Sequence, residues 1–117
     1  MSVYVSENSE SVTSGLSKMK AAMIEDYENF GGEMTDIRKR MCAEYAENFT
    51  ITHGKKYIKI GCKNSVVAFV VGVDNDKKFK KGDILKPAGW AAPARNGARG
   101  NILEGNYAIN WTGPLYL

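Results

Sequence analysis

Residues 65–73 read SVVAFVVGV, an almost wholly apolar run that is rich in β-branched valine and carries no charge. A short apolar run without alternation is typical of a strand that is covered on both faces. The run therefore predicts the central strand of a sheet. Phe69 lies in its middle, and an aromatic ring at that place is most simply a core residue.

The residues on both sides of this run predict further strands. Residues 49–53 and 57–62 alternate between apolar and polar side chains around a turn at 54–55, which is typical of a β-hairpin. Residues 83–86 are expected to re-enter the sheet, and residues 107–112 to form its last strand. Together with the central run they predict an antiparallel β-sheet of about five strands.

Upstream of the hairpin the apolar pattern becomes helical. The first helix is expected from about Ser9 to a stop at Gly31–Gly32, and the second from Met34 to Asn48, while residues 1–9 form a loose segment or a short edge strand. In both helices apolar residues recur every three or four positions. The first stripe is Val12, Leu16, Met19, Met23, Tyr27 and Phe30, and the second is Met34, Ile37, Met41 and Tyr45.

These elements predict a single α+β domain over residues 1–117, an N-terminal helical hairpin followed by the sheet. The helical segment covers 9–48, and the sheet segment covers 49–117 and contains a glycine-rich basic loop at 86–106. One small sheet cannot hide both helix stripes. We therefore expect a homo-oligomer with at least a dimer interface.

Composition favours a globular binding protein over an enzyme. The 117 residues are 44% hydrophobic and 25% charged, with no apolar run long enough for a membrane span and a polar N-terminus unlike a signal peptide, so we expect the cytoplasm. Cys42 and Cys62 are expected to be free thiols, and the single histidine, His53, belongs to a turn. The sequence has no metal-ligand cluster, nucleotide-fold fingerprint or nucleophile–base set, so it predicts no catalytic residue, metal site or cofactor.

Charge is divided unevenly along the chain. Residues 1–53 hold 5 Lys/Arg and 9 Asp/Glu, a net charge of −4, whereas residues 54–117 hold 11 and 4, a net charge of +7. The basic half attracts anions and the acidic half repels a long polyanion. This asymmetry favours a small anionic ligand, or one face on a nucleic acid.

The basic loop, KPAGWAAPARNGARGNILEGN at 86–106, has the residue types of an anion site. Glycines expose backbone N–H groups, and arginine offers a planar fork for phosphate oxygens. We interpret Arg95 and Arg99 as a phosphate-recognising wall. The alternative is an ordinary surface turn that uses glycine for its geometry and arginine for its solubility.

An aromatic side chain near these arginines would complete a nucleotide site. Trp90, Phe69 and Trp111 are the candidates for stacking on a purine. The combination suits a nucleotide with one base and two phosphates. Single-stranded nucleic acid needs the same parts repeated along a groove, so nucleic acid is a less favoured partner.

The order of parts resembles the Thoeris anti-defence one family of phage proteins: an N-terminal helical segment, a C-terminal sheet with a central aromatic, and a late Arg-x-x-x-Arg pair. The resemblance implies a sponge that binds a cyclic ADP-ribose isomer made by bacterial TIR-domain proteins and holds it uncleaved in the host cytosol. It also implies assembly through dimers, with ligand pockets between subunits. Some members are similar in binding cyclic oligonucleotides at a second site.

Carried onto this chain, the resemblance assigns the paired arginines to Arg95 and Arg99 and the stacking aromatic to Phe69. The asparagine of the family's pocket corresponds to Asn75 or to Asn96. Second-site residues stay unassigned.

Two other functions fit the same sequence. A small nucleic-acid-binding accessory protein would use the basic half, and its affinity would fall steeply with salt. A protein–protein inhibitor of a host factor would act through the methionine-rich helices or the apolar tail at 115–117.

Overall fold

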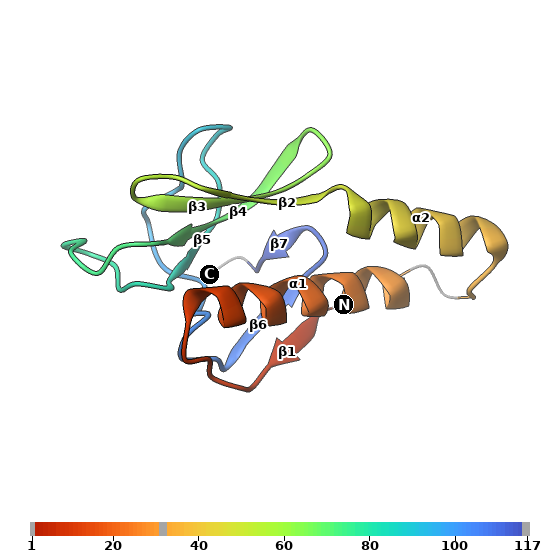
Figure 1. Cartoon of the computed structure of the whole chain (residues 1–117), viewed down its shortest axis with the longest axis horizontal. Helices are drawn as coiled ribbons and strands as arrows, with labels where there is room; N and C mark the ends of the chain where they lie inside the picture. Colours follow the sequence, from red (N-terminus) through yellow and green to blue (C-terminus); the bar gives the residue numbers. More distant parts are fainter. Residues whose placement is uncertain (1, 31–32, 116–117) are drawn as a thin grey trace.

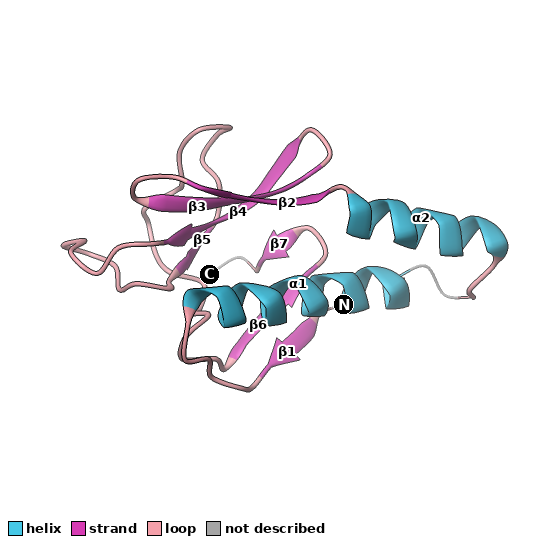
Figure 2. Ribbon diagram, viewed as in Figure 1, coloured by secondary structure: helices cyan, strands magenta, loops and turns pink. Residues whose placement is uncertain are grey.

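The computed structural model describes residues 2–30 and 33–115. It confirms the α+β class, with two helices and two antiparallel sheets (Figures 1 and 2). The four-stranded sheet has the order β2-β3-β4-β5, and the three-stranded sheet has the order β1-β6-β7. The strands of the four-stranded sheet are β2 Phe49–His53, β3 Tyr57–Cys62, β4 Ser65–Val71 and β5 Ile84–Leu85. The strands of the three-stranded sheet are β1 Val3–Val5, β6 Tyr107–Asn110 and β7 Gly113–Pro114.

The predicted hairpin and central strand are present, but the single sheet of about five strands is replaced by two sheets. β6 pairs with β1, with Val3 opposite Ile109, instead of joining the edge of the β4 sheet. The edge of that sheet is β5, which pairs with β4 at only two positions. Local alternation marks a segment as a strand, but it does not encode a partner a hundred residues away.

The main core lies between the two sheets, and α1 (Val12–Phe30) fills it. Leu16, Met19 and Met23 of α1 pack in one cluster with side chains from both sheets. Those of the four-stranded sheet include Ile60, and those of the three-stranded sheet include Ile109. The stripe predicted for the first helix is therefore the face that the core covers.

The opposite face of β4 is covered as well, as the apolar run predicts. Phe69, Val71 and Leu85 form a second buried cluster with Phe79 from the loop that follows β4. We call this the outer cluster. The segment from 86 to 100 lies over it, since Ala98 packs against the same side chains.

Gly113 sets how closely the two sheets approach. Its φ is +118°, and a Cβ at this position would lie 2.2 Å from the carbonyl oxygen of Val67 in β4. Only glycine fits there without moving backbone. β7, at the edge of the three-stranded sheet, therefore packs directly against β4 of the four-stranded sheet.

The second helix, α2 (Asp36–Glu47), begins later than the predicted Met34 because Thr35 caps it. The Thr35 hydroxyl accepts a hydrogen bond from the Arg38 amide at 3.2 Å, which satisfies one of the free donors of the first turn. α1 likewise begins after Ser9, at Val12, and its predicted stop at Gly31–Gly32 lies outside the described residues.

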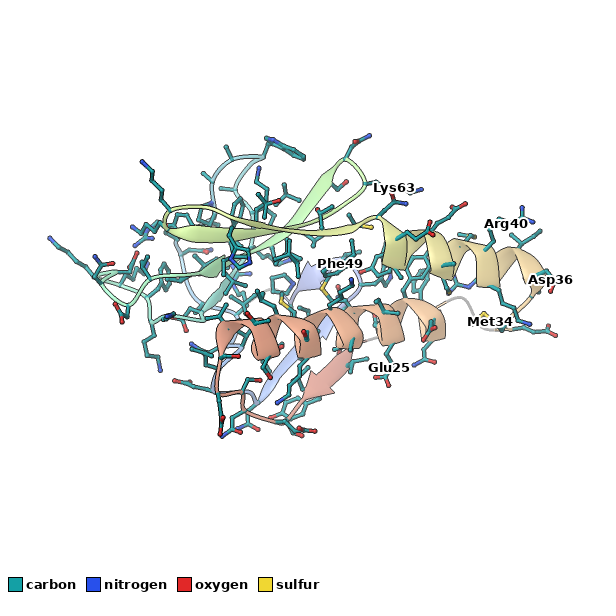
Figure 3. All side chains as sticks on the ribbon, in the orientation of Figure 1. Glu25, Met34, Asp36, Arg40, Phe49 and Lys63 are labelled. Carbon is teal, nitrogen blue, oxygen red and sulfur yellow. The ribbon has the colours of Figure 1, made fainter. Side chains whose placement is uncertain are left out.

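The apolar stripe of α2 is largely uncovered. Met34, Ile37 and Met41 are 41, 69 and 42% exposed, and only Tyr45 at the sheet end is buried. Figure 3 labels Met34, Asp36 and Arg40 at the outer part of the helical hairpin, away from the sheets. In the part of the chain that the structure describes, neither helix has the length and apolar character that crossing a membrane requires.

Candidate functional site

The basic loop has a fixed shape although it contains no long regular element. Its base is tied to β5, since the Arg99 amide donates to the Ile84 carbonyl at 2.7 Å and the Ile84 amide donates to the Gly100 carbonyl at 2.8 Å. Its tip is a narrow turn, closed by a hydrogen bond from the Ala88 amide to the Ala92 carbonyl at 3.0 Å. Trp90 lies at this tip.

Arg95 is held by a buried carboxylate of its own chain. Its two terminal nitrogens donate to the two Asp76 oxygens at 3.0 and 2.9 Å, and the Asp76 side chain is only 1% exposed. The guanidinium also donates to the Tyr57 hydroxyl and lies 4.9 Å from the ring centroid of Phe79. This bidentate pair fixes the loop against the outer cluster.

Asp76 collects further donors besides Arg95. The amides of Lys78 and Phe79 donate to it at 2.8 and 2.9 Å, and Lys56 Nζ lies 3.0 Å away. The hydrogen bonds from Arg95, followed by those from these two amides and from Lys56, hold the pKa of Asp76 well below its usual range. The carboxylate therefore stays charged in the folded protein at any ordinary pH.

Arg99 binds a different part of the chain. Its guanidinium donates to the Gly97 carbonyl at 3.1 Å, to the Asn96 side-chain oxygen at 3.0 Å and to the Leu115 carbonyl at 3.2 Å. The two arginines thus have separate acceptors within one chain and do not converge on a common point. That they grip a ligand's phosphates stays a prediction.

The remaining predicted residues lie in three different environments. Phe69 is 2% exposed, and its ring packs edge-on against Tyr57 with centroids 6.1 Å apart, so it is a core residue of the outer cluster. Asn75 is exposed in the turn before Asp76, and Asn96 is the Arg99 acceptor described above.

Trp90 is the predicted aromatic whose ring is largely exposed to solvent. It is 62% exposed, and the Lys59 ammonium lies 4.4 Å from its ring centroid. Lys59 lies two residues after Tyr57, so both project from the outer face of β3. One cation therefore fixes the indole at the loop tip.

Besides Lys59 at the tip, further cations lie at the base of this loop. Lys56 in the β2–β3 turn contacts Asp76, and the Lys78 ammonium donates to the Arg95 carbonyl, so these groups meet at the base of the loop. We call the set the basic surface. It consists of Lys56, Lys59, Lys78, Trp90 and Arg95, with the carboxylate of Asp76 at its base.

A hollow of about 470 Å³ opens at the other end of β3, between α2 and the β3–β4 turn. It is lined by aromatic and apolar side chains, with Lys63 and Glu44 among its polar groups. We call it the aromatic pocket. Its walls include Tyr27, Met41, Tyr45, Val66 and Trp111.

The walls of the aromatic pocket are tightly packed against one another. Tyr27 and Tyr45 stack with centroids 4.5 Å apart, and Trp111 meets Tyr27 edge-on at 5.2 Å. The Tyr45 hydroxyl donates to the Trp111 carbonyl at 2.8 Å. Burial also raises the pKa of the Cys62 thiol at the pocket wall, and Cys62 and Cys42 are free thiols, as predicted.

Sequence reasoning missed Asp76 and Lys59. Asp76 lies in the charged turn after β4, and that turn carries a signal, because an aspartate that accepts from the amides two and three residues later leaves its second oxygen for a cation. Lys59 shares the outer face of β3 with Tyr57, but no sequence signal pairs it with Trp90.

Within residues 2–30 and 33–115, no group of three or more His, Cys, Asp or Glu side chains is placed to hold a metal ion. Neither a curated protein nor a solved structure matches the chain. A family model does, over residues 3–117 and so over nearly the whole domain. The chain belongs to DUF7717, a family of unknown function.

Proposed function

We propose that this protein binds a phosphate-bearing nucleobase ligand at the basic surface without converting it chemically. The observation that carries the proposal is Trp90, which is 62% exposed at the tip of a hydrogen-bonded loop and lies over Lys59. A large aromatic ring held open to solvent among cations supplies both of the interactions that a nucleotide needs.

At this surface, stacking would bind the base and positive charge would bind the phosphate. A base that stacks on the exposed part of the indole contributes about 1–3 kcal/mol to the binding free energy. The contact of the indole with Lys59 restricts the ring before the ligand arrives, which lowers the entropy cost of binding. Lys56 and Lys78 lie where a phosphate attached to that base can reach them, because both contact the Asp76–Arg95 pair at the base of the loop. Arg95 serves this site as a scaffold for the loop.

The surface carries an excess of positive charge although Asp76 is part of it. The surface includes four cations and one carboxylate: Lys56 and Arg95 pair with Asp76, the Lys78 ammonium donates to the Arg95 carbonyl, and Lys59 lies on Trp90. The negative charge of Asp76 is offset by its ion pairs with Arg95 and Lys56, so the net charge of these groups is positive.

Two sources of the ligand are considered. The resemblance to the Thoeris anti-defence one family favours a cyclic nucleotide signal, such as a cyclic ADP-ribose isomer or a cyclic oligonucleotide, sequestered in the cytosol of a bacterial host. Single-stranded nucleic acid presents the same base and phosphate chemistry and is the alternative. The two differ in salt dependence, since a long strand releases more counterions than a small ligand does.

The test is titration of the purified protein with a cyclic ADP-ribose isomer, a cyclic dinucleotide and a short single-stranded oligonucleotide, followed by tryptophan fluorescence and calorimetry. Trp90→Ala should weaken binding at least about fivefold. Trp90→Phe should recover most of that loss because it keeps an aromatic face. Tyr4→Ala is the matched control, since Tyr4 is 61% exposed but lies on β1 in the other sheet.

A shallow fall in affinity with salt would identify the small ligand, and a steep fall the oligonucleotide. Intact ligand released from the protein by heating would support sequestration without cleavage. If no probe binds, or if Trp90→Ala and Tyr4→Ala bind equally well, the basic surface is not the site and the proposal is wrong.

A further inference from the structure

The tip of the helical hairpin carries a row of uncovered apolar side chains. Phe30 at the end of α1 is 59% exposed, Met34 just before α2 is 41% exposed, and Ile37 and Met41 in the first half of α2 are 69 and 42% exposed. We call these four residues the apolar row. Large apolar groups gathered on one part of a small domain mark a surface that is covered in the working protein.

The apolar row runs directly into the aromatic pocket. Met41 belongs to both, since it is part of the row and also lines the pocket with Glu44 and Tyr45. Ile37 lies one helical turn before Met41 and Glu44 about one turn after it, so the three share one flank of α2. The exposed Ile37 side chain and the aromatic pocket thus lie on the same flank of α2, on either side of Met41.

We propose that this flank is the contact surface for a second copy of the chain, with the two α2 helices antiparallel and a two-fold axis beside Met41. Ile37 is four residues before Met41, and Tyr45, at the pocket wall, is four residues after it. A two-fold axis at Met41 therefore sets the Ile37 of each copy against the aromatic pocket of the other. The surface is self-complementary, as an isologous dimer requires.

Charge selects the antiparallel arrangement. Before Met41, α2 has Asp36 and the three basic residues Arg38, Lys39 and Arg40, a net charge of +2, and after it Glu44 and Glu47, a net charge of −2. The Arg38 guanidinium donates to the Tyr27 carbonyl of its own chain, so Lys39 and Arg40 are the cations that can face a partner. When the helices run antiparallel, the basic half of each copy faces the acidic half of the other. A parallel pairing would oppose like charges, which disfavours it.

Arg40 and Glu44 are the exposed members of this charge pattern that lie nearest the axis. Both side chains are exposed, and Glu44 also lines the pocket that receives Ile37. Arg40 of one copy would therefore lie near Glu44 of the other at the rim of the contact. Such rim charges contribute mainly to the choice of partner and orientation.

The proposed contact is independent of ligand binding at the basic surface. The pocket is at the Cys62 end of β3, whereas Tyr57 and the Arg95–Asp76 pair are at its beginning. The five residue steps from Tyr57 to Cys62 in an extended strand separate these ends by about 17 Å. Loss of the dimer should therefore leave the Trp90 site intact, and the two proposals can fail separately.

The first experiment is sedimentation equilibrium of the full chain from about 1 to 100 μM, the range in which a modest interface dissociates. The wild-type protein should be a dimer at the upper end. Ile37→Asp should raise the dimer dissociation constant at least about tenfold, because it places a charge in the partner's aromatic pocket. The carboxylate is tolerated in the monomer, since Ile37 is in the first turn of α2.

Ala21→Asp is the matched control, because it adds the same charge at an exposed position of α1 away from the apolar row. It should leave the dissociation constant unchanged. A wild-type chain that stays monomeric over the whole range, or an Ile37→Asp variant that dimerises as well as the control, would overturn the proposal.

The second experiment tests the antiparallel register by mixing two variants. Arg40→Glu makes the two rim positions acidic and Glu44→Arg makes them basic, so each variant alone should be monomeric or weakly dimeric. An equimolar mixture should form a heterodimer, because both rim contacts then pair opposite charges. If the wild type dimerises but the mixture does not associate better than either variant alone, the antiparallel α2 contact is excluded.

Discussion

The two helices carry the same kind of apolar stripe, and the fold treats the stripes in opposite ways. On α1, Leu16, Met19 and Met23 are 4, 1 and 0% exposed, because both sheets close on that helix. On α2, Ile37 and Met41 are 69 and 42% exposed, because the helix extends past the sheets (Figure 1). Periodicity shows which face of a helix is apolar, but what covers that face is decided elsewhere in the chain or by another chain.

The largest expected effect tests this difference with one substitution made on each helix. Met23→Ala should lower the free energy of unfolding by about 2–5 kcal/mol, because it opens a cavity in the main core. Met41→Ala removes the same atoms from a half-exposed site and should cost within about 0.5 kcal/mol in the monomer. Urea unfolding at low protein concentration measures both, and equal losses would mean that α2 is covered within its own chain.

A smaller effect on stability is expected from Asp76, a buried carboxylate that is held in a loop and not in a helix. The pKa of Asp76 is depressed in the folded state, so its contribution to stability is full above the unfolded value of about 4 and is lost as pH falls toward the folded value. The free energy of unfolding should therefore decline below about pH 4. Asp76→Asn should be less stable than the wild type at neutral pH and should show a flatter decline in acid.

Arg95→Lys provides the control for that measurement. A lysine keeps one charge beside Asp76 but loses the second of the two parallel hydrogen bonds. Its stability at neutral pH should lie between those of the wild type and Asp76→Asn. An acid profile of Asp76→Asn identical to that of the wild type would assign the acid sensitivity to other carboxylates.

The fold could be predicted from sequence wherever neighbours along the chain decide it. Residues 65–71 contain their own signal, since an uncharged run rich in valine suits a strand with two covered faces. The division into two sheets could not be predicted. It depends on β1 pairing with β6, and nothing in Val3–Val5 indicates a partner at Tyr107–Asn110.

The candidate site shows the same limit at the level of side chains. The sequence marks the loop at 86–106 as unusual and offers Trp90 as a candidate for stacking, and a role of either in binding stays a prediction. It could not show that Arg95 would be bound by Asp76, nineteen positions away, because many carboxylates of the chain were equally available as partners. Arginine in a glycine-rich loop is therefore an ambiguous signal: it can bind a ligand, or it can hold the loop in place.

A still smaller effect on stability is expected from the buried hydroxyl of Tyr107. The Tyr107 hydroxyl is buried without a hydrogen-bond partner among residues 2–30 and 33–115, and burial raises the pKa of Tyr107 to about 12. The raised pKa leaves stability independent of this group below the unfolded pKa of about 10, and stability then falls as pH rises through the folded value, because ionisation favours the unfolded chain. Tyr107→Phe should be neutral or stabilising by about 1 kcal/mol at pH 7, since it removes an unpaired group.

The same variant should also lose less stability than the wild type between pH 10 and the folded value of about 12. Chemical unfolding at several pH values measures both quantities. Tyr4→Phe is the control, because Tyr4 is exposed and its hydroxyl donates to Asn106 at 3.2 Å. A clear loss of stability for Tyr107→Phe at pH 7 would mean that its hydroxyl has a partner, such as a buried water.

The smallest expected effect on the monomer is also the sharpest test of the comparison between the helices. Ile37→Ala should change the free energy of unfolding by no more than about 0.5 kcal/mol at low concentration, because Ile37 is 69% exposed and alanine is the better helix former. At high concentration the wild-type melting temperature should rise with concentration, since a dimer adds binding energy to folding, and Ile37→Ala should flatten that rise. A loss above about 1 kcal/mol at low concentration would show that Ile37 is buried within one chain. The contrast between a covered α1 and an uncovered α2 would then be wrong, and with it the reason to expect a second copy.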